Sequence, residues 1–573
     1  MIKRYAPFLK GYGIYAILAP ITVILEVLLE IRIPFYMSKI IDVGVANRDI
    51  PYILQTGGMM VLMAVLSLLF GALSGMFASK GAMGFGKGIR RAVFYKIQEF
   101  SFANVDRFNT ASLITRLTTD VTSVQMTFMM LIRVFVRSPF MLVSATIMAS
   151  RVNPRLVVIF LVAIPVLATA LIVIMCMAFP RFKRMLTCYD RMNGSVQENL
   201  IAMRVVKAFV REDYENGKFA DDAEALRAAQ LKAEKIVICN MPIMQLVIYV
   251  CIISVLWFGG NMVISQTMGT GELMSFISYV TQILMSLMML SMIFINLVMT
   301  RASIARINEV LDETLDIPDV ESTVQVEGAS VEFCDVSFSY HKDPNNLVLR
   351  DINLSIEPGE TVGIIGGTGS SKTSLVQLIP RLYDVQSGKV LVGGRDVRDY
   401  RLEELRRAVS MVLQKNVLFS GTIMENLKWG DPDATEEEVY KACRAAQAHD
   451  FIMSFPEGYQ TYLGQGGVNV SGGQKQRLCI ARALLKKPQI IILDDSTSAV
   501  DTTTDAKIRK VLREELAGTT TIIIAQRISS VCDADKIVVM EDGRIDAIGT
   551  HDELLASNAV YREVYESQQR GAE

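Results

Sequence analysis

Long apolar stretches alternate with polar segments in the first half of the chain, and their lengths predict helices that cross a membrane. A helix needs about 20 apolar residues to span the hydrocarbon core of a bilayer. Residues 1–300 are therefore predicted to form an all-α membrane domain with six spans. The spans are expected near residues 14–36, 57–79, 127–150, 156–179, 241–265 and 273–298.

Two polar segments, residues 80–125 and 181–240, are much longer than the other connections. Their apolar residues recur at helical spacing, as in Val196, Leu200 and Met203, so we expect the spans to continue as helices into two long loops. Both segments and the N-terminus are rich in Lys and Arg, which concentrate on the cytoplasmic side. The chain is therefore predicted to be a multi-pass protein of the cell (cytoplasmic) membrane, with its N-terminus, long loops and second half in the cytoplasm.

A few polar side chains interrupt the spans. Glu26 and Glu30 are one helical turn apart in the first span, as are Arg133 and Arg137 in the third, so each pair shares a helix face. Charged groups at membrane depth usually face a cavity or a partner. These groups are interpreted either as part of a path for a substrate, or as structural: paired between helices or snorkelling near the membrane edge. Methionines at helical spacing over residues 285–299 suit promiscuous apolar ligands, and they equally suit simple packing.

The pattern changes after the sixth span. Residues 301–327 gain Asp, Glu and Pro and are predicted to form a linker. Strand-like runs at 331–340 and 347–356 follow, and apolar runs then alternate with helical patterns. Residues 328–573 are therefore predicted to form an α/β domain.

A glycine-rich turn between an apolar run (361–365) and a helical pattern is the main motif of this second domain. In such a P-loop, backbone N–H groups wrap nucleotide phosphates, a Lys reaches the β- and γ-phosphates, and a Ser or Thr holds Mg²⁺. Ser371 stands where the pattern has its second Gly, so we expect nucleotide binding with altered geometry, because a Cβ hinders close approach of phosphate. The expected phosphate-binding residues are Gly366, Gly367, Thr368, Gly369, Ser370, Ser371, Lys372, Thr373 and Ser374.

Two further segments carry phosphate-site chemistry. The apolar run 490–493 ends in Asp494 and Asp495, as a Walker B strand does when its Asp holds Mg²⁺. Upstream of it, a turn of small residues opens the helical pattern 475–485 and exposes backbone N–H groups to an anion. This turn consists of Ser471, Gly472, Gly473 and Gln474.

These motifs, in this order, resemble those of the ATP-binding cassette (ABC) transporters, and the six spans with long cytoplasmic loops resemble the exporter type. The resemblance covers essentially the whole chain. It implies a six-helix transmembrane domain fused to a cytoplasmic α/β P-loop nucleotide-binding domain, with ATP and Mg²⁺ as ligands. In this family two halves pair head to tail, and each ATP lies between one half's P-loop and the other half's signature, here residues 470–474.

The same resemblance implies roles for single residues. Tyr340 resembles the aromatic side chain that stacks on adenine. Gln414 resembles the Q-loop residue between Mg²⁺ and the membrane domain, so Thr373, Gln414 and Asp494 are the expected metal site. The D-loop corresponds to residues 498–501, including Asp501. Segments 106–116 and 211–219 resemble the coupling helices that touch the nucleotide domains.

Two positions depart from the family pattern at the catalytic centre. Asp495 stands where the family usually has a catalytic Glu, and Gln526 where it has a switch His. A carboxylate one methylene shorter should hold the attacking water badly, and general-base catalysis is typically worth about 10² to 10⁴ in rate. Gln can donate a hydrogen bond to a phosphate but cannot become an imidazolium. With Ser371, these substitutions fall on one side of the ATP sandwich, whereas the signature is intact.

The resemblance therefore predicts the degenerate-site subunit of a heterodimeric bacterial multidrug-type exporter, whose signature completes the active site of a second half-transporter chain. Two alternatives remain, an active homodimeric exporter and a nucleotide-gated channel or regulatory membrane subunit. The apolar, Met-rich spans leave drugs, lipids and peptides open as apolar or amphipathic substrates. The net charge of -1 gives no case for a nucleic-acid partner.

Overall fold

The computed structural model describes residues 2–496, 500–515 and 518–570. Its contacts divide the chain into two compact units, residues 1–98 with 109–313, and residues 99–108 with 314–573. The first unit is helical, and the second contains the β-sheets.

Six helical segments within the described residues are long and apolar enough to cross a membrane. This confirms the predicted all-α membrane domain. All six extend beyond the apolar stretches of the sequence, as expected if the helices continue outside the bilayer. The segments are Gly13–Val45, Ile50–Gln98, Thr110–Val152, Val158–Ile201, Glu212–Ile264 and Thr270–Asp312.

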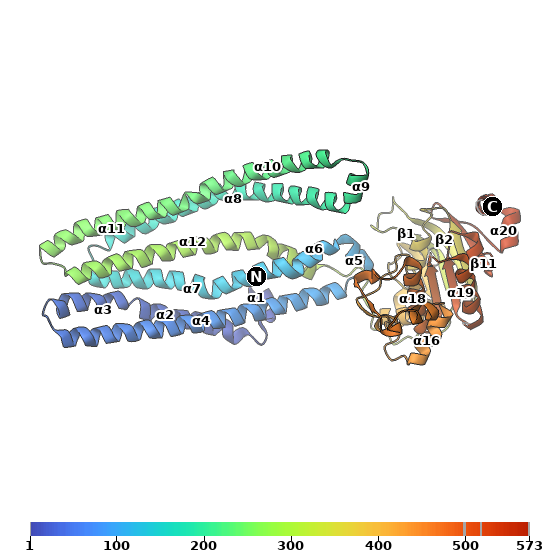
Figure 1. Ribbon diagram of the computed structural model, residues 1–573, viewed down its shortest axis with the longest axis horizontal. Helices are drawn as coiled ribbons and strands as arrows, with labels where there is room; N and C mark the ends of the chain where they lie inside the picture. The colour runs from blue at the N-terminus through green and yellow to red at the C-terminus, as the bar shows by residue number, and fades with distance from the viewer. Residues whose placement is uncertain (1, 497–499, 516–517, 571–573) are drawn as a thin grey trace. The chain divides into compact units, whose positions relative to one another are not determined.

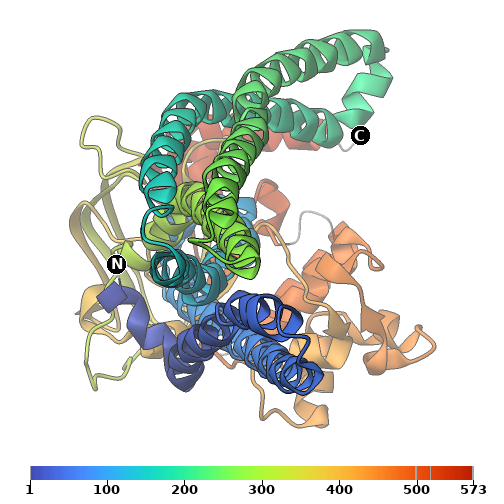
Figure 2. The same ribbon diagram turned by 90° about the vertical axis from the view of Figure 1, so that its left-hand side faces the viewer.

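Within the helical unit, α7 packs along α12 and α2 packs along α4 (Figure 1). Figure 2 shows the hairpin of α8, α9 and α10, in teal and green, projecting away from the dark blue α2. The elements are α1 (Ile2–Tyr5), η1 (Ala6–Leu9), α2 (Gly13–Glu30), α3 (Ile33–Lys39), η2 (Ile40–Val45), α4 (Ile50–Gln98), α6 (Thr110–Thr115), η3 (Arg116–Asp120), α7 (Val121–Val152), α8 (Val158–Ile201), α9 (Met203–Ala208), α10 (Glu212–Ile238), α11 (Asn240–Ile264) and α12 (Thr270–Asp312).

The start of α12 is capped by a residue far away in the sequence. The carboxylate of Asp42 accepts hydrogen bonds from the backbone N–H groups of Gly271 at 2.7 Å and Glu272 at 2.9 Å. These N–H groups belong to the first turn of the helix, where no intrahelical acceptor exists. A Cβ at Gly271 would lie 2.5 Å from the carbonyl oxygen of Ser38, so this close contact requires glycine.

The predicted linker, residues 301–327, begins inside α12, which continues to Asp312. Ile307 and Val310 are buried there, and Arg306 donates hydrogen bonds to both carboxylate oxygens of Asp120. These contacts keep the polar end of the helix folded. The turn between α8 and α10 also differs from the expectation: its short helix is α9, whereas residues 212–219 open α10.

The second unit contains a four-stranded sheet of order β2-β1-β4-β5, a six-stranded sheet of order β12-β11-β3-β10-β9-β6 and the pair β7-β8. The strands are β1 (Val331–Phe338), β2 (Leu349–Ile356), β3 (Thr361–Gly366), β4 (Ser387–Val392), β5 (Arg395–Asp396), β6 (Val409–Val412), β7 (Gly421–Thr422), β8 (Tyr462–Leu463), β9 (Ile490–Asp494), β10 (Thr520–Ile524), β11 (Lys536–Glu541) and β12 (Arg544–Gly549).

Short helices alternate with these strands, which confirms the predicted α/β fold of the second half. They are α5 (Phe102–Arg107), α13 (Lys372–Gln377), η4 (Val397–Asp399), α14 (Leu402–Ala408), α15 (Ile423–Leu427), α16 (Glu436–Ala445), α17 (His449–Met453), η5 (Gly458–Gln460), η6 (Gln465–Gly467), α18 (Gly472–Leu485), α19 (Thr502–Glu515), η7 (Ile528–Ser530), α20 (His551–Ser557) and α21 (Ala559–Arg570).

The six-stranded sheet sets the position of the candidate site. Strands β6, β9, β10, β3 and β11 pair in parallel, and β12 is antiparallel to β11. Strands β9 and β10 are buried along their whole length, as expected for a parallel sheet covered on both faces. Ligands of such sheets bind at the carboxyl ends of the strands. The loops that follow these strands therefore meet at one edge.

One piece of the first long polar segment folds with this unit. The side chain of Asn104 in α5 donates a hydrogen bond to the carbonyl of Thr314 at 2.9 Å and accepts one from the N–H of Asp316 at 3.1 Å. The ring of Phe102 packs edge-on against Tyr383, with ring centroids 6.1 Å apart. The contacts of α5 are thus mainly with the α/β unit.

Candidate functional site

A cavity of about 530 Å³ lies at the carboxyl edge of the parallel sheet. Residues from four neighbouring strand ends line it. Among them are Gly366, Gly367, Thr368, Gly369, Ser371, Lys372, Thr373 and Ser374 after β3, Gln414 after β6, Asp494 and Asp495 at the end of β9, and Gln526 after β10. The structure therefore brings together most of the residues that the sequence motifs indicated.

The glycine-rich loop between β3 and α13 is closely packed where it begins and left-handed where it ends. A Cβ at Gly366 would lie 2.2 Å from the carbonyl oxygen of Met540, so only glycine fits there. Ser371 occupies the left-handed region, with φ 69° and ψ 23°. This is the position where the P-loop pattern has its second Gly, and the backbone there still has the conformation that favours glycine.

Lys372 folds over this loop. Its Nζ donates hydrogen bonds to the carbonyl oxygens of Gly366 and Gly367, both at 2.8 Å, and to Ser370 Oγ at 3.2 Å. Burial lowers the pKa of Lys372, and the nearby carboxylates of Asp494 and Asp495 oppose that shift. The ammonium group is thus held at the mouth of the loop by carbonyl groups.

The donors expected for Mg²⁺ fit a hard cation. Thr373 Oγ1 donates a hydrogen bond to Asp494 Oδ1 at 3.0 Å. Asp494 is 1% exposed, and its Oδ2 has no hydrogen-bond partner among the described residues. Burial raises the pKa of Asp494. A buried carboxylate oxygen beside a hydroxyl group matches the oxygen ligands that Mg²⁺ prefers.

The two positions that depart from the family pattern contact each other. Gln526 Nε2 donates a hydrogen bond to Asp495 Oδ2 at 2.8 Å, and Gln414 Nε2 lies 3.5 Å from the same oxygen. Burial raises the pKa of Asp495, whereas the two amide donors lower it. Asp495 itself has φ 48°, in the left-handed region. The carboxylate at the catalytic position is therefore engaged by two glutamine side chains.

Tyr340 is connected to the P-loop helix from outside the cavity wall. Its hydroxyl lies 2.7 Å from Ser374 Oγ, and its ring packs edge-on against Tyr383 with centroids 5.0 Å apart. The Tyr383 hydroxyl in turn donates a hydrogen bond to Asp106 Oδ2 of α5 at 2.5 Å. A continuous row of contacts thus links α5 to Tyr340 and α13.

The signature residues lie outside the cavity wall that the structure describes. Ser471 is the N-cap of α18: its N–H donates to Gln474 Oε1 at 2.9 Å, and its Oγ accepts from the N–H of Gln474 at 3.3 Å. Gly472 and Gly473 open this helix, and Gly472 is exposed whereas Gly473 is half-buried. Asp501 accepts a hydrogen bond from the N–H of Thr504 at 2.9 Å. The D-loop residues Ser498 and Ala499 lie outside the described residues.

Sequence reasoning missed the C-terminal helix α21. Three of its side chains, those of Val560, Tyr561 and Val564, line the cavity. The Gln568 side chain forms hydrogen bonds with the backbone of the residues before and after Arg527. The regular spacing of apolar residues in this helix indicates a buried face but not what that face covers.

The structure brings together three charged groups of the spans, Glu26, Glu30 and Arg137. Arg137 donates hydrogen bonds to Glu26 and to Glu30, the latter at 2.7 Å. Glu26 is 8% exposed, and a Cβ at Gly71 would lie 3.1 Å from its carboxyl group. This geometry favours structural pairing between α2 and α7 over a substrate path at these residues.

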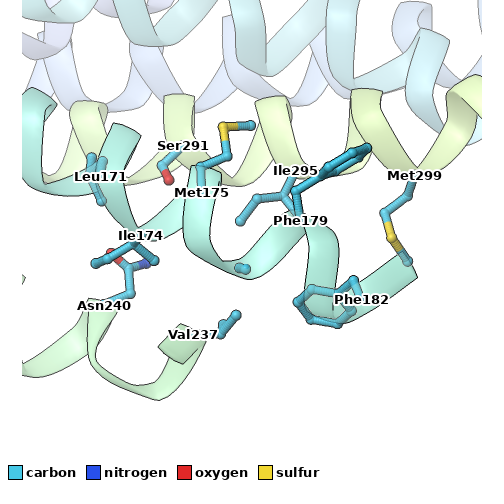
Figure 3. Close-up of a pocket in the computed structure, with 11 residues that line it drawn as sticks. Leu171, Ile174, Met175, Phe179, Phe182, Val237, Asn240, Ser291, Ile295 and Met299 are labelled. Carbon is cyan, nitrogen blue, oxygen red and sulfur yellow. The ribbon is translucent and has the colours of Figure 1, made fainter. Parts of the chain in front are cut away.

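The helical unit also contains a small apolar cavity of about 230 Å³ between α8, α12 and the junction of α10 and α11. Figure 3 shows the rings of Phe179 and Phe182 at the same end of it as Met299. The Oδ1 atom of Asn240, which lines the cavity, is buried and has no hydrogen-bond partner among the described residues. An apolar wall with one amide suits an amphipathic ligand.

Comparisons with known proteins place these sites in a family. Residues 16–287 match the model of the ABC transporter transmembrane region, and residues 349–498 match the ABC transporter model. The chain belongs to the ABC transporter family. This ABC transporter is 38% identical to "Uncharacterized ABC transporter ATP-binding protein YfiB" of Bacillus subtilis, over 99% of this chain and 98% of that protein. It is 34% identical to the "ATP-dependent lipid A-core flippase" of Syntrophus aciditrophicus, over 84% of this chain and 80% of that protein.

A solved structure agrees with this assignment. The transporter is similar to a bacterial Atm1-family ABC exporter with ATP bound, with a TM-score of 0.83 and 25% identity over 99% of this chain and 98% of the other. The chain therefore has the fold of an ABC exporter, with a multi-pass membrane domain and an ABC ATPase domain.

Proposed function

We propose that this chain is one half of an ATP-driven exporter that works by alternating access. Its own P-loop site binds ATP but hydrolyses it slowly, and its signature completes the active site of a second, different half. The observation that carries this proposal is the hydrogen bond from Gln526 to Asp495, because it joins the two substituted positions of the catalytic centre.

The chemistry of the site supports binding without fast hydrolysis. Lys372 and the N–H groups of the P-loop would hold the phosphates, and Thr373, Gln414 and Asp494 would hold Mg²⁺. When bound, Mg²⁺ neutralises charge that develops on the phosphate oxygens. Hydrolysis further requires a carboxylate that orients water, and Asp495 is one methylene shorter than Glu. Its Oδ2 also accepts from Gln526, which reduces its capacity to accept a proton from water.

The substrate is proposed to be an apolar or amphipathic small molecule. The apolar cavity supports this class, because it is lined by Asn240, whose buried Oδ1 has no hydrogen-bond partner among the described residues. The relative named a lipid A-core flippase supports it too. We further propose that the protein lies in the cell membrane with its nucleotide-binding domain in the cytoplasm, as the basic loops predict.

Hydrolysis of Mg²⁺-ATP by the chain purified alone in lipid tests the degenerate site, with ATP binding measured on the same sample. We expect binding that is lost in Lys372→Ala and little turnover. The double variant Asp495→Glu with Gln526→His should raise turnover by about 10² or more, the range of general-base catalysis. Brisk turnover by the unmodified chain, lost in Lys372→Ala, would instead indicate an active homodimer.

A second measurement tests the division of labour between the two halves. In the complex with the partner half, Gly472→Asp should abolish hydrolysis, because it places a side chain and a negative charge on the helix N-terminus that faces the partner's ATP. Asp495→Asn should change the rate little. Equal and complete losses in both variants would exclude the asymmetric model.

A further inference from the structure

We propose that Gln568 in the C-terminal helix α21 is a positioning residue for Gln526. Its two hydrogen bonds to the backbone around Gln526, called the clamp below, set how well the site distinguishes ATP from ADP. The proposal rests on the proposed function: Gln526 stands at the position of the family's switch His, from which its amide can donate a hydrogen bond to the γ-phosphate of bound ATP. Gln568 Nε2 donates to the carbonyl oxygen of Gln526 at 2.8 Å, and Gln568 Oε1 accepts from the N–H of Ile528 at 2.9 Å.

These two hydrogen bonds hold backbone groups that lie beyond the end of β10. Strand β10 ends at Ile524, and the backbone then passes through Gln526 and Arg527 into η7, which begins at Ile528. One side-chain amide satisfies a carbonyl and an N–H two residues apart, as an adjacent strand would. Backbone groups without such partners are free to shift or to bond water. The position of Gln526 therefore depends on Gln568.

Helix α21 is itself fixed to the α/β unit. Tyr561 is 1% exposed, and its hydroxyl lies 2.8 Å from His551 Nδ1. Asn558 Oδ1 accepts from the N–H of Tyr561 at 2.8 Å, and Asn558 Nδ2 donates to Asp546 at 2.6 Å. The buried Tyr561 packs in the same apolar cluster as Ile528. These contacts anchor the first turn of α21, about two helical turns before Gln568.

The clamp acts at the wall of the nucleotide cavity. Val560, Tyr561 and Val564 of the same helix line the cavity, as does the Gln526 side chain. The reach of a glutamine amide toward a phosphate depends on where its backbone is held, because its hydrogen bonds weaken steeply with distance and angle. ADP has no γ-phosphate, so loosening the backbone of Gln526 should weaken ATP binding selectively.

Equilibrium binding of Mg²⁺-ATP and Mg²⁺-ADP to the full chain in lipid nanodiscs tests this inference. Gln568→Met keeps the length and packing of the side chain and removes both hydrogen bonds. We expect it to weaken ATP binding roughly three- to tenfold, the size of one ordinary hydrogen bond, with ADP binding unchanged. Gln568→Glu keeps the hydrogen-bond acceptor and loses the donor, so it should also lower the preference for ATP over ADP. This variant tests the same hydrogen bonds if the Met variant fails to fold.

The matched control is Gln569→Met on the neighbouring, exposed position, which should leave both affinities unchanged. Equal weakening of ATP and ADP, or the same effect in Gln569→Met, would overturn the proposal. Gln526→Ala tests the role of Gln526 separately from the role of Gln568. An unchanged ATP preference in that variant overturns the role of Gln526 itself. A changed preference there, with no change in Gln568→Met, overturns only the clamp.

Discussion

Replacing Ser371 by Gly should stabilise the nucleotide-binding domain. A residue with a Cβ in the left-handed region costs about 1–2 kcal/mol relative to glycine, and Ser371 lies there with φ 69°. Glycine adds about 0.4–1 kcal/mol of conformational freedom to the unfolded chain. The Ser371 side chain makes no capping hydrogen bond with α13, so little is lost with it. The net gain should be about 0.5–1 kcal/mol, or about 1–4 °C in melting temperature for a domain of this size.

The two tryptophans make this gain measurable in the full chain. Trp257 lies in α11 and Trp429 in the α/β unit, so a Trp257→Phe background leaves Trp429 as the single tryptophan reporter. Ser370→Gly is the matched control, because the Ser370 hydroxyl donates a hydrogen bond to the Gly367 carbonyl at 2.9 Å and its loss should lower the melting temperature. If Ser371→Gly lowers the melting temperature as Ser370→Gly does, the strain argument is wrong.

Three further predictions concern other contacts. Tyr383→Phe removes the hydrogen bond to Asp106 and should speed hydrogen exchange in α5 about tenfold, since bonds to charged groups contribute about 1.5 kcal/mol or more; unchanged exchange would refute this. Burial raises the pKa of Asp494, so its charge destabilises the fold at neutral pH and this penalty disappears as the pH falls through the raised pKa. Without added nucleotide, Asp494→Asn should therefore raise the melting temperature at pH 7 more than at acidic pH, and an equal effect at both would count against it. Arg137→Met leaves two unpaired carboxylates in the spans and should destabilise by about 3–5 kcal/mol; adding Glu-to-Gln changes at both carboxylates should restore stability.

The residues that carry the chemistry of the site were easier to predict from the sequence than the contacts around them. The P-loop and the Walker B strand were predictable because each motif is continuous in sequence and lies directly at a strand end. The bond between Gln526 and Asp495 joins residues from different strands, and it follows only once β9 and β10 are known to be neighbours. Gln568 could not be assigned, because no motif indicates that a helix end returns to the loop after β10. The extension of α12 was missed because its polar end is held by Arg306 and Asp120, a pairing between distant segments.

The order of strands also explains how binding and hydrolysis can be separated by substitution. Lys372 and Thr373 follow β3, whereas Asp494 ends β9, Asp495 comes directly after it, and Gln526 follows β10. Backbone pairing within the parallel sheet fixes these strand ends whatever side chains they carry. A shorter carboxylate at position 495 or an amide at position 526 therefore changes the group presented to the phosphates without moving the P-loop. This independence of binding from catalysis supports the proposal that the site binds nucleotide but activates water poorly.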